Sequence, residues 1–306
     1  MKILFLGTPE FAAVSLRALL DSSHTVVGVV TQPDRALKHG KTELSAVKQL
    51  ALSAGLPVYQ PIKIRADVEK LKSFGADIAV TAAYGQILDS GVLNAFKYGV
   101  INVHASLLPK YRGASPIQAA IAAGERTTGV TIMRTELGLD TGDILSTVAT
   151  EIGETETAGE LTERLAELGA KLLVQTLDNF DGITPCKQDD SIATHCKTIS
   201  KSEQIIDFSV DSKTVVNKIR ALSPSPCAKT FIDGEQYKIY RVSVCEDIVL
   251  GVVGQVVCAK DKMYIVCGNG VVSVDVIQAP SKRAMPIADF LRGKKFKDGV
   301  ICAKQP

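Results

Sequence analysis

Short runs of hydrophobic residues, separated by polar or glycine-containing turns, mark the first half of the chain. Continuous apolar runs of this kind are typical of strands that are buried on both faces of a sheet. The candidate strands are Met1–Leu6, Val26–Thr31, Val58–Gln60, Ile78–Ala82, Gly99–His104 and Val130–Met133. Helical segments, among them Phe11–Leu19 and Leu44–Ala54, lie between most of these runs. Because strands alternate with helices, the pattern predicts a parallel sheet with right-handed crossovers and helices on both faces.

A longer helix is predicted to close this half of the chain. Thr157 and Glu160 have the spacing of a capping box, which marks a helix start. Behind them, leucines recur with the period of a helix at positions 161, 165, 168, 172 and 177. The next segment contains Gly182 and Pro185 and shows no periodicity. The prediction is therefore an α/β domain over residues 1–188 and a linker over residues 189–206.

Beyond residue 206 the pattern changes to short β-rich runs separated by turn residues. These runs are Lys229–Ile232, Tyr237–Val244, Gly254–Ala259, Met263–Val266 and Val271–Val276. Their spacing is typical of a small antiparallel barrel, so residues 207–306 are predicted to form a C-terminal, OB-like β-barrel domain. The predicted fold class is α/β, with a Rossmann-like parallel-sheet domain followed by this barrel.

Composition narrows the class of protein. The chain has 306 residues, of which 46% are hydrophobic and 22% charged, and this excludes a disordered or collagen-like chain. No apolar run reaches the about 18 residues of a membrane-spanning helix, so no membrane association is expected. Seven cysteines, none before Cys186 and none in a C-x-x-C pair, favour reduced thiols and a cytoplasmic location. The histidines at 24, 39, 104 and 195 lack metal-ligand spacing, so no metal site is expected.

The formal net charge of +2 hides an asymmetry along the chain. The first 200 residues carry 19 Lys+Arg against 22 Asp+Glu, whereas the remaining residues carry 16 against 11. A basic C-terminal third fits a polyanionic partner such as RNA, and an ordinary solvated surface has the same composition.

Candidate chemistry begins at the end of the strand Gly99–His104. Ligand sites of open parallel sheets lie at the carboxyl ends of strands. Because side chains alternate along a strand, Asn102 and His104 point the same way. An amide and an imidazole at that position can bind a carbonyl oxygen and transfer a proton. A hydrogen-bonded core histidine beside a buried amide is the alternative interpretation.

Two neighbouring loops add to this pattern. Residues 106–116 form a turn rich in Pro, Gly and cations, and the strand Val130–Met133 leads into Gly138–Asp143. Asp140 lies between two glycines, which let backbone approach a ligand closely. Its carboxylate can orient His104 or relay a proton, although the same residues also suit a plain polar turn. Asn, His and Asp at strand ends are more specific together than any one of them.

Six segments of the chain occur in the order and at the spacings of one enzyme family. They are Gly7–Phe11, Gln32–Arg35, Ala83–Leu88, Asn102–Pro109, Arg112–Ala114 and Gly138–Asp143. Asn-Val-His-x-Ser-Leu-Leu-Pro together with Leu-Asp-Thr-Gly-Asp is specific for the formyltetrahydrofolate-dependent formyltransferases. The sequence resembles this family, and within it the methionyl-tRNA formyltransferases, from residue 1 to about residue 300.

The resemblance implies a formyl donor, an acceptor and a set of site residues. The donor would be 10-formyltetrahydrofolate, bound by the N-terminal domain, and the catalytic positions fall on Asn102, His104 and Asp140. The folate-binding positions fall on Ser106, Leu107, Leu108, Pro109, Tyr84, Gly85, Ile87, Leu88 and Leu139. Initiator methionyl-tRNA would be held by the C-terminal barrel and by an inserted loop over residues 32–42. The expected tRNA-binding cations are Arg35, Lys38, His39, Lys41, Lys282, Arg283, Arg292 and Lys294. Neither a metal nor an obligate protein partner is implied.

The chemistry of these residues fits formyl transfer to a primary amine. The amine must be neutral to attack, and the formyl oxygen gains negative charge as its carbon becomes tetrahedral. The Asn102 amide and a protonated His104 are suited to stabilise that oxygen. Asp140 could pass a proton toward the leaving nitrogen. The residues leave open whether His104 or water takes the proton of the amine.

Two segments depart from the family pattern. In the inserted loop, His39 stands at a common arginine position and Glu43 adds a negative charge, which bears on how strongly the loop holds tRNA. In Leu222–Pro226, serines replace an asparagine and a tryptophan that are usual in the family, and the chain has no tryptophan. The C-terminal basic cluster consists of Lys282, Arg283, Arg292, Lys294, Lys295 and Lys297, and Asp289 is the one acid within its span.

Other function classes share parts of this pattern. A sugar-nucleotide formyltransferase would use the same three residues without needing the C-terminal basic cluster, and a formyltetrahydrofolate hydrolase would use them with water as acceptor. A nicotinamide-dependent oxidoreductase requires G-x-G-x-x-G after the first strand, where this chain has Gly7-Thr8-Pro9-Glu10. A non-catalytic RNA-binding barrel is disfavoured by the intact Asn, His and Asp.

Overall fold

The computed structural model describes residues 1–36, 42–245 and 251–305 of the chain. Their packing forms two compact units, each assembled from separate stretches. Unit 1 comprises Met1–Gly113, Thr127–Glu151 and Thr162–Cys196, and unit 2 comprises Ala114–Arg126, Ile152–Leu161 and Lys197–Pro306. These boundaries differ from the predicted division at residues 189–206, because two segments of the first half group with the part of the chain that follows Cys196.

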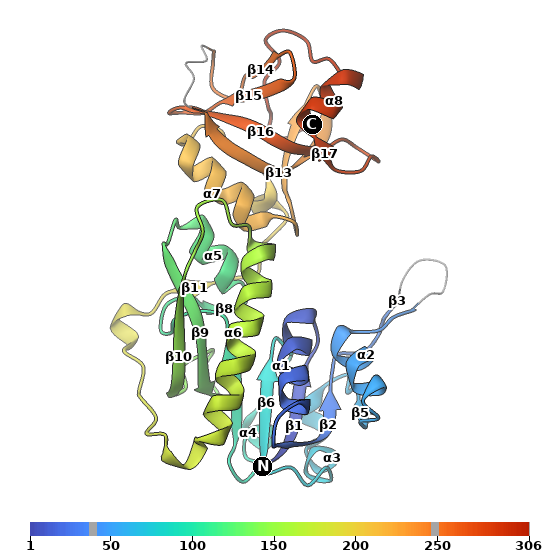
Figure 1. Cartoon of the computed structure of the whole chain (residues 1–306), viewed down its shortest axis with the longest axis vertical. Helices are drawn as coiled ribbons and strands as arrows, with labels where there is room; N and C mark the ends of the chain where they lie inside the picture. Colours follow the sequence, from blue (N-terminus) through green and yellow to red (C-terminus); the bar gives the residue numbers. More distant parts are fainter. Residues whose placement is uncertain (37–41, 246–250, 306) are drawn as a thin grey trace. The chain divides into compact units, whose positions relative to one another are not determined.

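Unit 1 is built on a seven-stranded sheet with the strand order β10-β9-β7-β6-β1-β2-β5 (Figure 1). The strands are β1 Lys2–Gly7, β2 Thr25–Val30, β5 Val58–Tyr59, β6 Ile78–Ala82, β7 Val100–His104, β9 Thr127–Arg134 and β10 Ile144–Glu151. The first five pair in parallel, which confirms the predicted α/β sheet. Strand β9 runs antiparallel to both β7 and β10. Strand β10 was not predicted, because its residues alternate between exposed and partly buried at the edge of the sheet.

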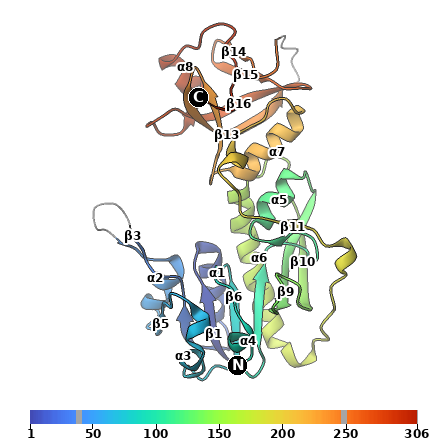
Figure 2. The same ribbon diagram turned by 180° about the vertical axis from the view of Figure 1, so that it is seen from behind.

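Helices cover both faces of this sheet (Figures 1 and 2). They are α1 Glu10–Leu20, α2 Ala46–Ser53, α3 Val68–Lys72, α4 Ser90–Leu93 and α6 Ala158–Asp178. On one face, Leu71 of α3 and Val92 of α4 join a buried cluster with Leu4, Leu6 and Val100 of the strands. On the other face α6 lies close to β7 and β9, since a Cβ on Gly169 would be 3.1 Å from methyl groups of Val103 and Val130.

The predicted capping box begins α6. The Thr157 N–H donates to Glu160 Oε2 at 2.8 Å, and the Glu160 N–H donates to Thr157 Oγ1 at 3.3 Å. These bonds satisfy amides that have no partner inside the helix. Of the predicted leucine stripe, Leu161, Leu165 and Leu177 are buried, while positions 168 and 172 are half-buried.

Unit 2 is a β domain whose strands pair throughout in the antiparallel sense, in the order β12-β13-β16-β15-β14, with β17 beside β16. The strands are β12 Ala228–Ile232, β13 Glu235–Cys245, β14 Val256–Ala259, β15 Lys262–Val266, β16 Val271–Gln278 and β17 Met285–Pro286. The first five match the predicted runs closely. The segment after residue 299 joins the two ends of this order, because Ala303 pairs with Phe231 of β12 and Val300 accepts from Val256 of β14. The strands therefore follow a closed path.

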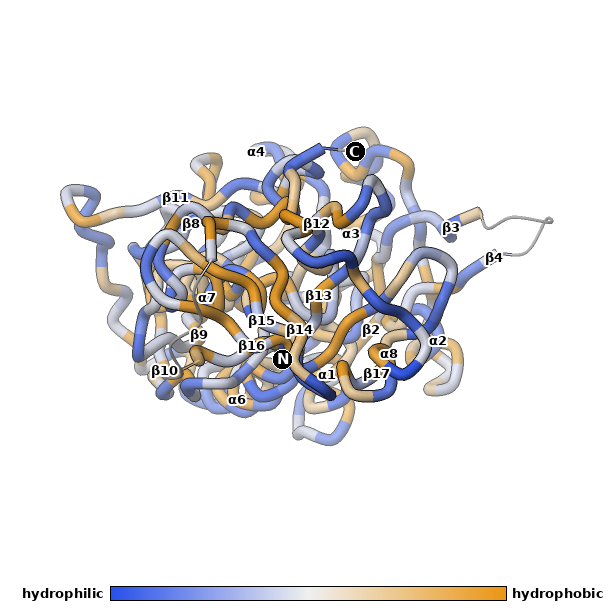
Figure 3. The backbone as a smooth tube through the Cα atoms, turned by 90° about the horizontal axis from the view of Figure 1, so that it is seen from above, coloured by the Kyte–Doolittle hydropathy of each residue, from blue (hydrophilic) through white to orange (hydrophobic). Residues whose placement is uncertain are grey.

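Three helices belong to unit 2: α5 Pro116–Ala122, α7 Ser212–Leu222 and α8 Ile287–Gly293. Helix α5 packs on α7, and α7 and α8 pack on the strands. Apolar residues of α7 and α8, Ile219 and Phe290 among them, share one core with Tyr237 and Ile265 of the strands. Hydrophobic residues concentrate in strands such as β2 and β15, while much of the connecting backbone is hydrophilic (Figure 3).

Two short strand pairs complete the fold. Strand β3 (Arg35–Ala36) pairs antiparallel with β4 (Thr42–Glu43), and β8 (Arg112–Gly113) pairs in parallel with β11 (His195–Cys196). Single 3₁₀ turns lie at Ile64–Ala66, Phe180–Gly182, Asp190–Ile192 and Ser202–Gln204. Within the described ranges, no helix is long and apolar enough to cross a membrane.

Candidate active site

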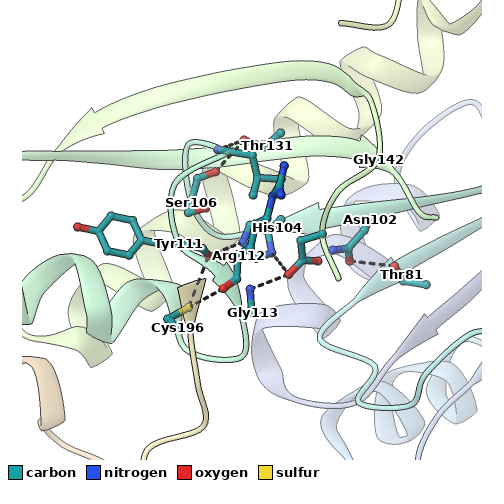
Figure 4. Close-up of polar contacts among 12 residues, drawn as sticks. Thr81, Asn102, His104, Ser106, Tyr111, Arg112, Gly113, Thr131, Gly142 and Cys196 are labelled. Atoms are coloured by element: carbon teal, nitrogen blue, oxygen red, sulfur yellow. Dashed lines mark hydrogen bonds and ion pairs between the residues drawn. The ribbon is translucent and has the colours of Figure 1, made fainter. Parts of the chain in front are cut away.

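The end of β7 places Asn102 and His104 side by side (Figure 4). Both share the face of the sheet that carries Val100, whereas the intervening Val103 points to α6. This alternation is the consequence of the strand geometry. His104 is buried, with 5% of its surface exposed, so its ring orientation is set by its neighbours.

The imidazole of His104 is held by a main-chain carbonyl. Its Nε2 lies 3.0 Å from the carbonyl oxygen of Tyr111. Since a carbonyl oxygen only accepts, Nε2 must carry a hydrogen. The other ring nitrogen, Nδ1, lies 3.7 Å from Asp140 Oδ2. That separation is longer than a hydrogen bond, so this is an ion-pair contact whenever the ring is protonated.

Asp140 lies in the loop between β9 and β10, with a backbone φ of +53°. Its Oδ2 accepts a hydrogen bond from the Gly113 N–H at 2.8 Å. Gly113 has a φ of +118°, and a Cβ there would lie 2.1 Å from the carbonyl oxygen of Cys196. Glycine is therefore required at 113, and its amide anchors the carboxylate beside His104.

The side chain of Asn102 is oriented by a threonine on the neighbouring strand. Thr81 Oγ1 donates to Asn102 Oδ1 at 2.8 Å and leaves the amide nitrogen pointing away from β6 (Figure 4). In the described part of the chain, that nitrogen donates no hydrogen bond. The structure thus brings the three predicted catalytic side chains together. The NH₂ group of Asn102 remains available to donate hydrogen bonds to a ligand.

The predicted folate loop after β7 is organised from within. Ser106 is fully buried, and its hydroxyl donates to the Lys110 carbonyl at 2.6 Å. Thr131 Oγ1 donates to the Ser106 carbonyl at 2.7 Å and accepts from the Leu108 N–H at 3.2 Å. Leu108 is buried as well, while Leu107 and Pro109 are half-buried. Ser106 and Leu108 therefore fix the shape of the loop from inside, and Leu107 and Pro109 lie nearer its surface.

Two other loops carry large apolar side chains at the surface. Ile87 is 88% exposed in the loop after β6, and Leu137 and Leu139 are 73% and 65% exposed in the loop that holds Asp140. Gly85, with a φ of +87°, shapes the first of these loops. Large apolar side chains exposed on loops are one feature of ligand sites.

Two predicted folate contacts lie in the hydrophobic core. Tyr84 and Leu88 are 4% and 8% exposed and belong to the cluster beneath α3 and α4. The Tyr84 hydroxyl has no hydrogen-bond partner among the residues described. Burial raises the pKa of this hydroxyl, and the nearby Tyr59 raises it further.

Three polar residues of this region were not among the predicted site residues: Thr81, Arg112 and Gln188. Arg112 is 4% exposed, and its guanidinium bonds to Gln188 and Asp190. In the sequence, Arg112 is part of a family motif but has no predicted role. No motif or pattern in the sequence indicates a role for Gln188. In the part of the chain with assigned positions, no group of three or more His, Cys, Asp or Glu side chains could hold a metal ion.

The predicted tRNA-binding cations differ in their surroundings. Arg35 is exposed on β3, and Lys282 and Arg283 are exposed in unit 2. Arg292 pairs with Asp289 at 2.8 Å, and Lys294 pairs with Glu235 at 3.0 Å. Asp289 is thus not the only acid near the cluster, because β13 supplies Glu235 from 59 positions away. The predicted residues Lys38, His39 and Lys41 lie outside the described residues.

Two family models match the chain. Residues 1–177 match the formyl transferase model, and residues 198–295 match the formyl transferase C-terminal domain. A methionyl-tRNA formyltransferase of Citrifermentans bemidjiense is 40% identical, over 100% of this chain and 97% of its own length. Another, from Lachnospira eligens, is 43% identical over 98% of this chain and 99% of its own length.

The chain belongs to the methionyl-tRNA formyltransferase family. This membership confirms the resemblance seen in the sequence and the enzyme class that it implied. As members of a formyltransferase family, such proteins depend on a folate formyl donor.

Solved structures of a sequence-distant N-formyltransferase and of HypX share the fold. An N-formyltransferase from Helicobacter canadensis, in complex with folinic acid and dTDP-3-aminofucose, has a TM-score of 0.67 and 20% identity over 90% of this chain and 98% of that one. HypX from Aquifex aeolicus, in complex with tetrahydrofolic acid, has a TM-score of 0.66 and 18% identity over 97% of this chain and 49% of that one. At such identities the likeness concerns the fold, so the full-length methionyl-tRNA formyltransferases carry the assignment.

Proposed function

We propose that this chain transfers the formyl group of 10-formyltetrahydrofolate to the α-amino group of initiator methionyl-tRNA, and that it supports translation initiation in the cytoplasm. One observation carries the proposal: His104 Nδ1, the Asp140 carboxylate and the Asn102 amide meet at the carboxyl end of β7 in a chain whose full-length relatives are methionyl-tRNA formyltransferases. All seven cysteines are thiols, in keeping with a reducing compartment.

The exposed apolar loops support a site for the flat pterin ring of the donor. Ile87 on one loop and Leu137 and Leu139 on the other expose most of their surface. Covering such a side chain is worth about 1.5–3 kcal/mol when burial is complete. We assign these three residues to the walls of the folate site, with Leu107 and Pro109 at its edge, while Tyr84, Leu88 and Ser106 fix the shape of the loops from below.

The reaction forms one C–N bond and breaks another. The neutral α-amine attacks the formyl carbon, which becomes tetrahedral, and the bond to N10 of the folate then breaks. The amine nitrogen loses one proton, and N10 gains one. Asn102, with its amide NH₂ uncommitted, donates to the oxygen that gains negative charge, and a preorganised donor of this kind stabilises the transition state more than the ground state.

The geometry of His104 selects the atom that exchanges the proton. The Tyr111 carbonyl keeps a hydrogen on Nε2, so Nδ1 is the ring nitrogen that gains or loses a proton during the reaction. Asp140 lies 3.7 Å from Nδ1 and stabilises the ring when it is charged. In our proposal Nδ1 takes the proton of the amine and returns it to N10, while Asp140 keeps the ring in place.

For tRNA, the cations without acidic partners are the better candidates. Lys282 and Arg283 are exposed and form no ion pair with any residue described, whereas Arg292 and Lys294 each face a carboxylate. Arg35 offers a further positive charge on β3. Lys and Arg contacts to phosphates release counterions, so the affinity for tRNA should fall as salt rises.

The test is an acceptor competition with the whole chain. Methionyl-initiator tRNA, a UDP-amino-sugar and water are offered together with 10-formyltetrahydrofolate, and formyl-methionyl-tRNA, formylated sugar and free formate are measured. We expect formyl-methionyl-tRNA to dominate and His104→Ala to abolish it with the fold retained in circular dichroism. Preferential formylation of the sugar, or release of formate alone, would refute the proposal.

The basic surface is tested separately by binding. In Lys282→Ala/Arg283→Ala the slope of log Kd against log salt should become shallower by about two, because two phosphate contacts are lost. Lys171→Ala, which removes an exposed lysine of α6 in unit 1, is the matched control and should keep the slope. An unchanged slope in the double variant would remove these two residues from the tRNA site.

A further inference from the structure

A buried amide and a buried guanidinium connect the two loops that hold His104 and Asp140. Gln188 is 7% exposed and Arg112 is 4% exposed. Gln188 lies in the irregular segment after α6, far in sequence from either loop. Backbone bonds in both directions between Ile144 and Cys186 fix the start of this segment against β10. Its position is therefore defined, although it lies outside the main sheet.

The Gln188 side chain uses its whole hydrogen-bonding capacity on these loops. Its Nε2 donates to the Asp140 carbonyl at 2.9 Å and to the Gly142 carbonyl at 2.7 Å. Its Oε1 accepts from Arg112 Nε at 3.1 Å and from Arg112 Nη2 at 2.8 Å. Asp190 Oδ1 accepts a further bond from Nη2 at 2.7 Å. One amide thus spans both sides of the turn at Asp140 and joins it to Arg112.

Chemistry allows only one orientation of that amide. A guanidinium donates and cannot accept, whereas the two main-chain carbonyls accept and cannot donate. The amide oxygen must therefore face Arg112, and the amide nitrogen must face the turn. A carboxylate at 188 would set a negative oxygen against two carbonyls, and an apolar side chain would leave all four groups without this partner.

Arg112 also connects Gln188 to His104, through the backbone of the two residues next to Arg112 in the sequence. The carbonyl of Tyr111, one residue before, holds His104 Nε2, and the N–H of Gly113, one residue after, binds the Asp140 carboxylate. The contacts form a ring that runs from His104 through the 111–113 backbone and Gln188 to Asp140 and back to His104. Figure 4 shows Arg112, Tyr111 and Gly113 grouped around His104.

The backbone conformation of the turn at Asp140 has to be stabilised by surrounding contacts. Asp140 has a φ of +53°, a left-handed conformation that a non-glycine residue adopts at a cost. Gly142 lies so close to β9 that a Cβ there would be 2.0 Å from the Arg134 carbonyl oxygen. Residues in such conformations persist when their surroundings fix them, and Gln188 contacts the carbonyls on both sides of Thr141.

We propose that Gln188, oriented by Arg112, is a positioning residue that sets the carboxylate of Asp140 against His104 Nδ1. Gln188 contacts neither reactant and acts through Asp140 alone. This inference rests on the proposed function, because the role of Asp140 in formyl transfer is part of that proposal. A displacement of about 1 Å at a catalytic group can cost roughly 100-fold in rate, so loss of Gln188 should lower kcat by about 10- to 100-fold.

The test compares Gln188→Met, Asp140→Asn and the double variant in the full chain. Gln188→Met removes the amide without changing charge. We expect kcat to fall while both KM values stay within about threefold, and we expect the double variant to be no slower than Asp140→Asn, since Gln188 acts through that carboxylate. Gln204→Met is the matched control: Gln204 is equally buried, but its Oε1 accepts from Lys229 in unit 2.

Ring ¹⁵N signals of His104 give a readout that a loss of stability alone would not move. In Gln188→Met they should shift toward their values in Asp140→Asn. If the two kcat effects multiply in the double variant, or if the His104 signals stay at their wild-type values, the inference is wrong. If Gln188→Met does not fold, Gln188→Glu keeps the bond to Arg112, and its kcat decides by the same criterion. An inactive wild-type chain would instead contradict the proposed function.

Discussion

Replacing Asn102 by alanine separates a transition-state donor from a structural side chain. Asn102 is half-buried, and among the residues that the structure describes its side chain bonds only to Thr81, at 2.8 Å. Losing that bond should lower the free energy of unfolding by about 0.5–1.5 kcal/mol, a modest part of the stability of a domain. Losing an oxyanion donor should raise the activation free energy by about 2.7–4 kcal/mol, or roughly 100- to 1000-fold in kcat. Catalysis should therefore suffer far more than folding.

The assay is steady-state formylation of methionyl-tRNA at several donor concentrations, together with thermal unfolding of each variant. KM for 10-formyltetrahydrofolate should change little, because the Asn102 amide acts on charge that develops only during the reaction. Thr81→Val keeps the amide but removes the hydroxyl that orients it, and its kcat should fall between wild type and Asn102→Ala. A kcat for Asn102→Ala within about threefold of wild type would show that the amide does not stabilise the oxyanion.

Three further predictions concern single positions. Tyr84→Phe removes a buried hydroxyl that lacks a hydrogen-bond partner in the described chain. It should therefore raise the free energy of unfolding by about 1 kcal/mol and leave KM for the folate donor unchanged. A lower melting temperature would contradict this. Gly113→Ala sets a Cβ 2.1 Å from the Cys196 carbonyl oxygen at a φ of +118° and should lower both the melting temperature and kcat, whereas Gly182→Ala, with nothing within 4 Å, should change neither. Hydrogen bonds from Lys304 and Ser209 lower the pKa of Asp207 to about 2, so this carboxylate stabilises the fold above pH 4 and loses that effect as the pH falls through 2. Asp207→Asn should therefore be less stable than wild type at pH 7, by under about 1 kcal/mol because the pair is exposed, and equal to it only near about pH 1, where the carboxyl is protonated in the folded and the unfolded chain; a difference that persists there would argue against this cause.

Strands whose apolar residues are buried on both faces were predictable from the sequence. β1, β2, β6 and β7 were found with nearly the observed ends, because a continuous apolar run leaves little choice of structure. The strands of unit 2 were also found, since turn residues separate them. Helix α7 was missed: its helical signal rests on Val215, Ile219 and Leu222 among polar residues, within a stretch that otherwise favoured strands.

The candidate site was predictable only as far as strand ends could indicate it. Asn102 and His104 follow from strand alternation. Asp140 does not follow from strand ends, because β9 runs antiparallel to β7 and its last residue, Arg134, pairs with Ile101 and not with His104. Gln188 could not be found in this way, because it meets Arg112 across 76 positions and Gly142 across 46, and neither local pattern nor residue type encodes such contacts. The same holds for Glu235, which neutralises Lys294 only in the folded barrel.

The assembly of unit 2 from distant stretches has a practical consequence for dissecting this enzyme. Helix α5 packs against α7, and Arg220 of α7 donates to the carbonyls of Gly153 and Glu156. A fragment that stops before residue 197 would leave α5 and the 152–161 segment without the surface they cover, and the complementary fragment would lack part of its own interior. Neither half should behave as a native piece when it is expressed apart, so substitutions in the intact polypeptide are the sounder route to assigning roles.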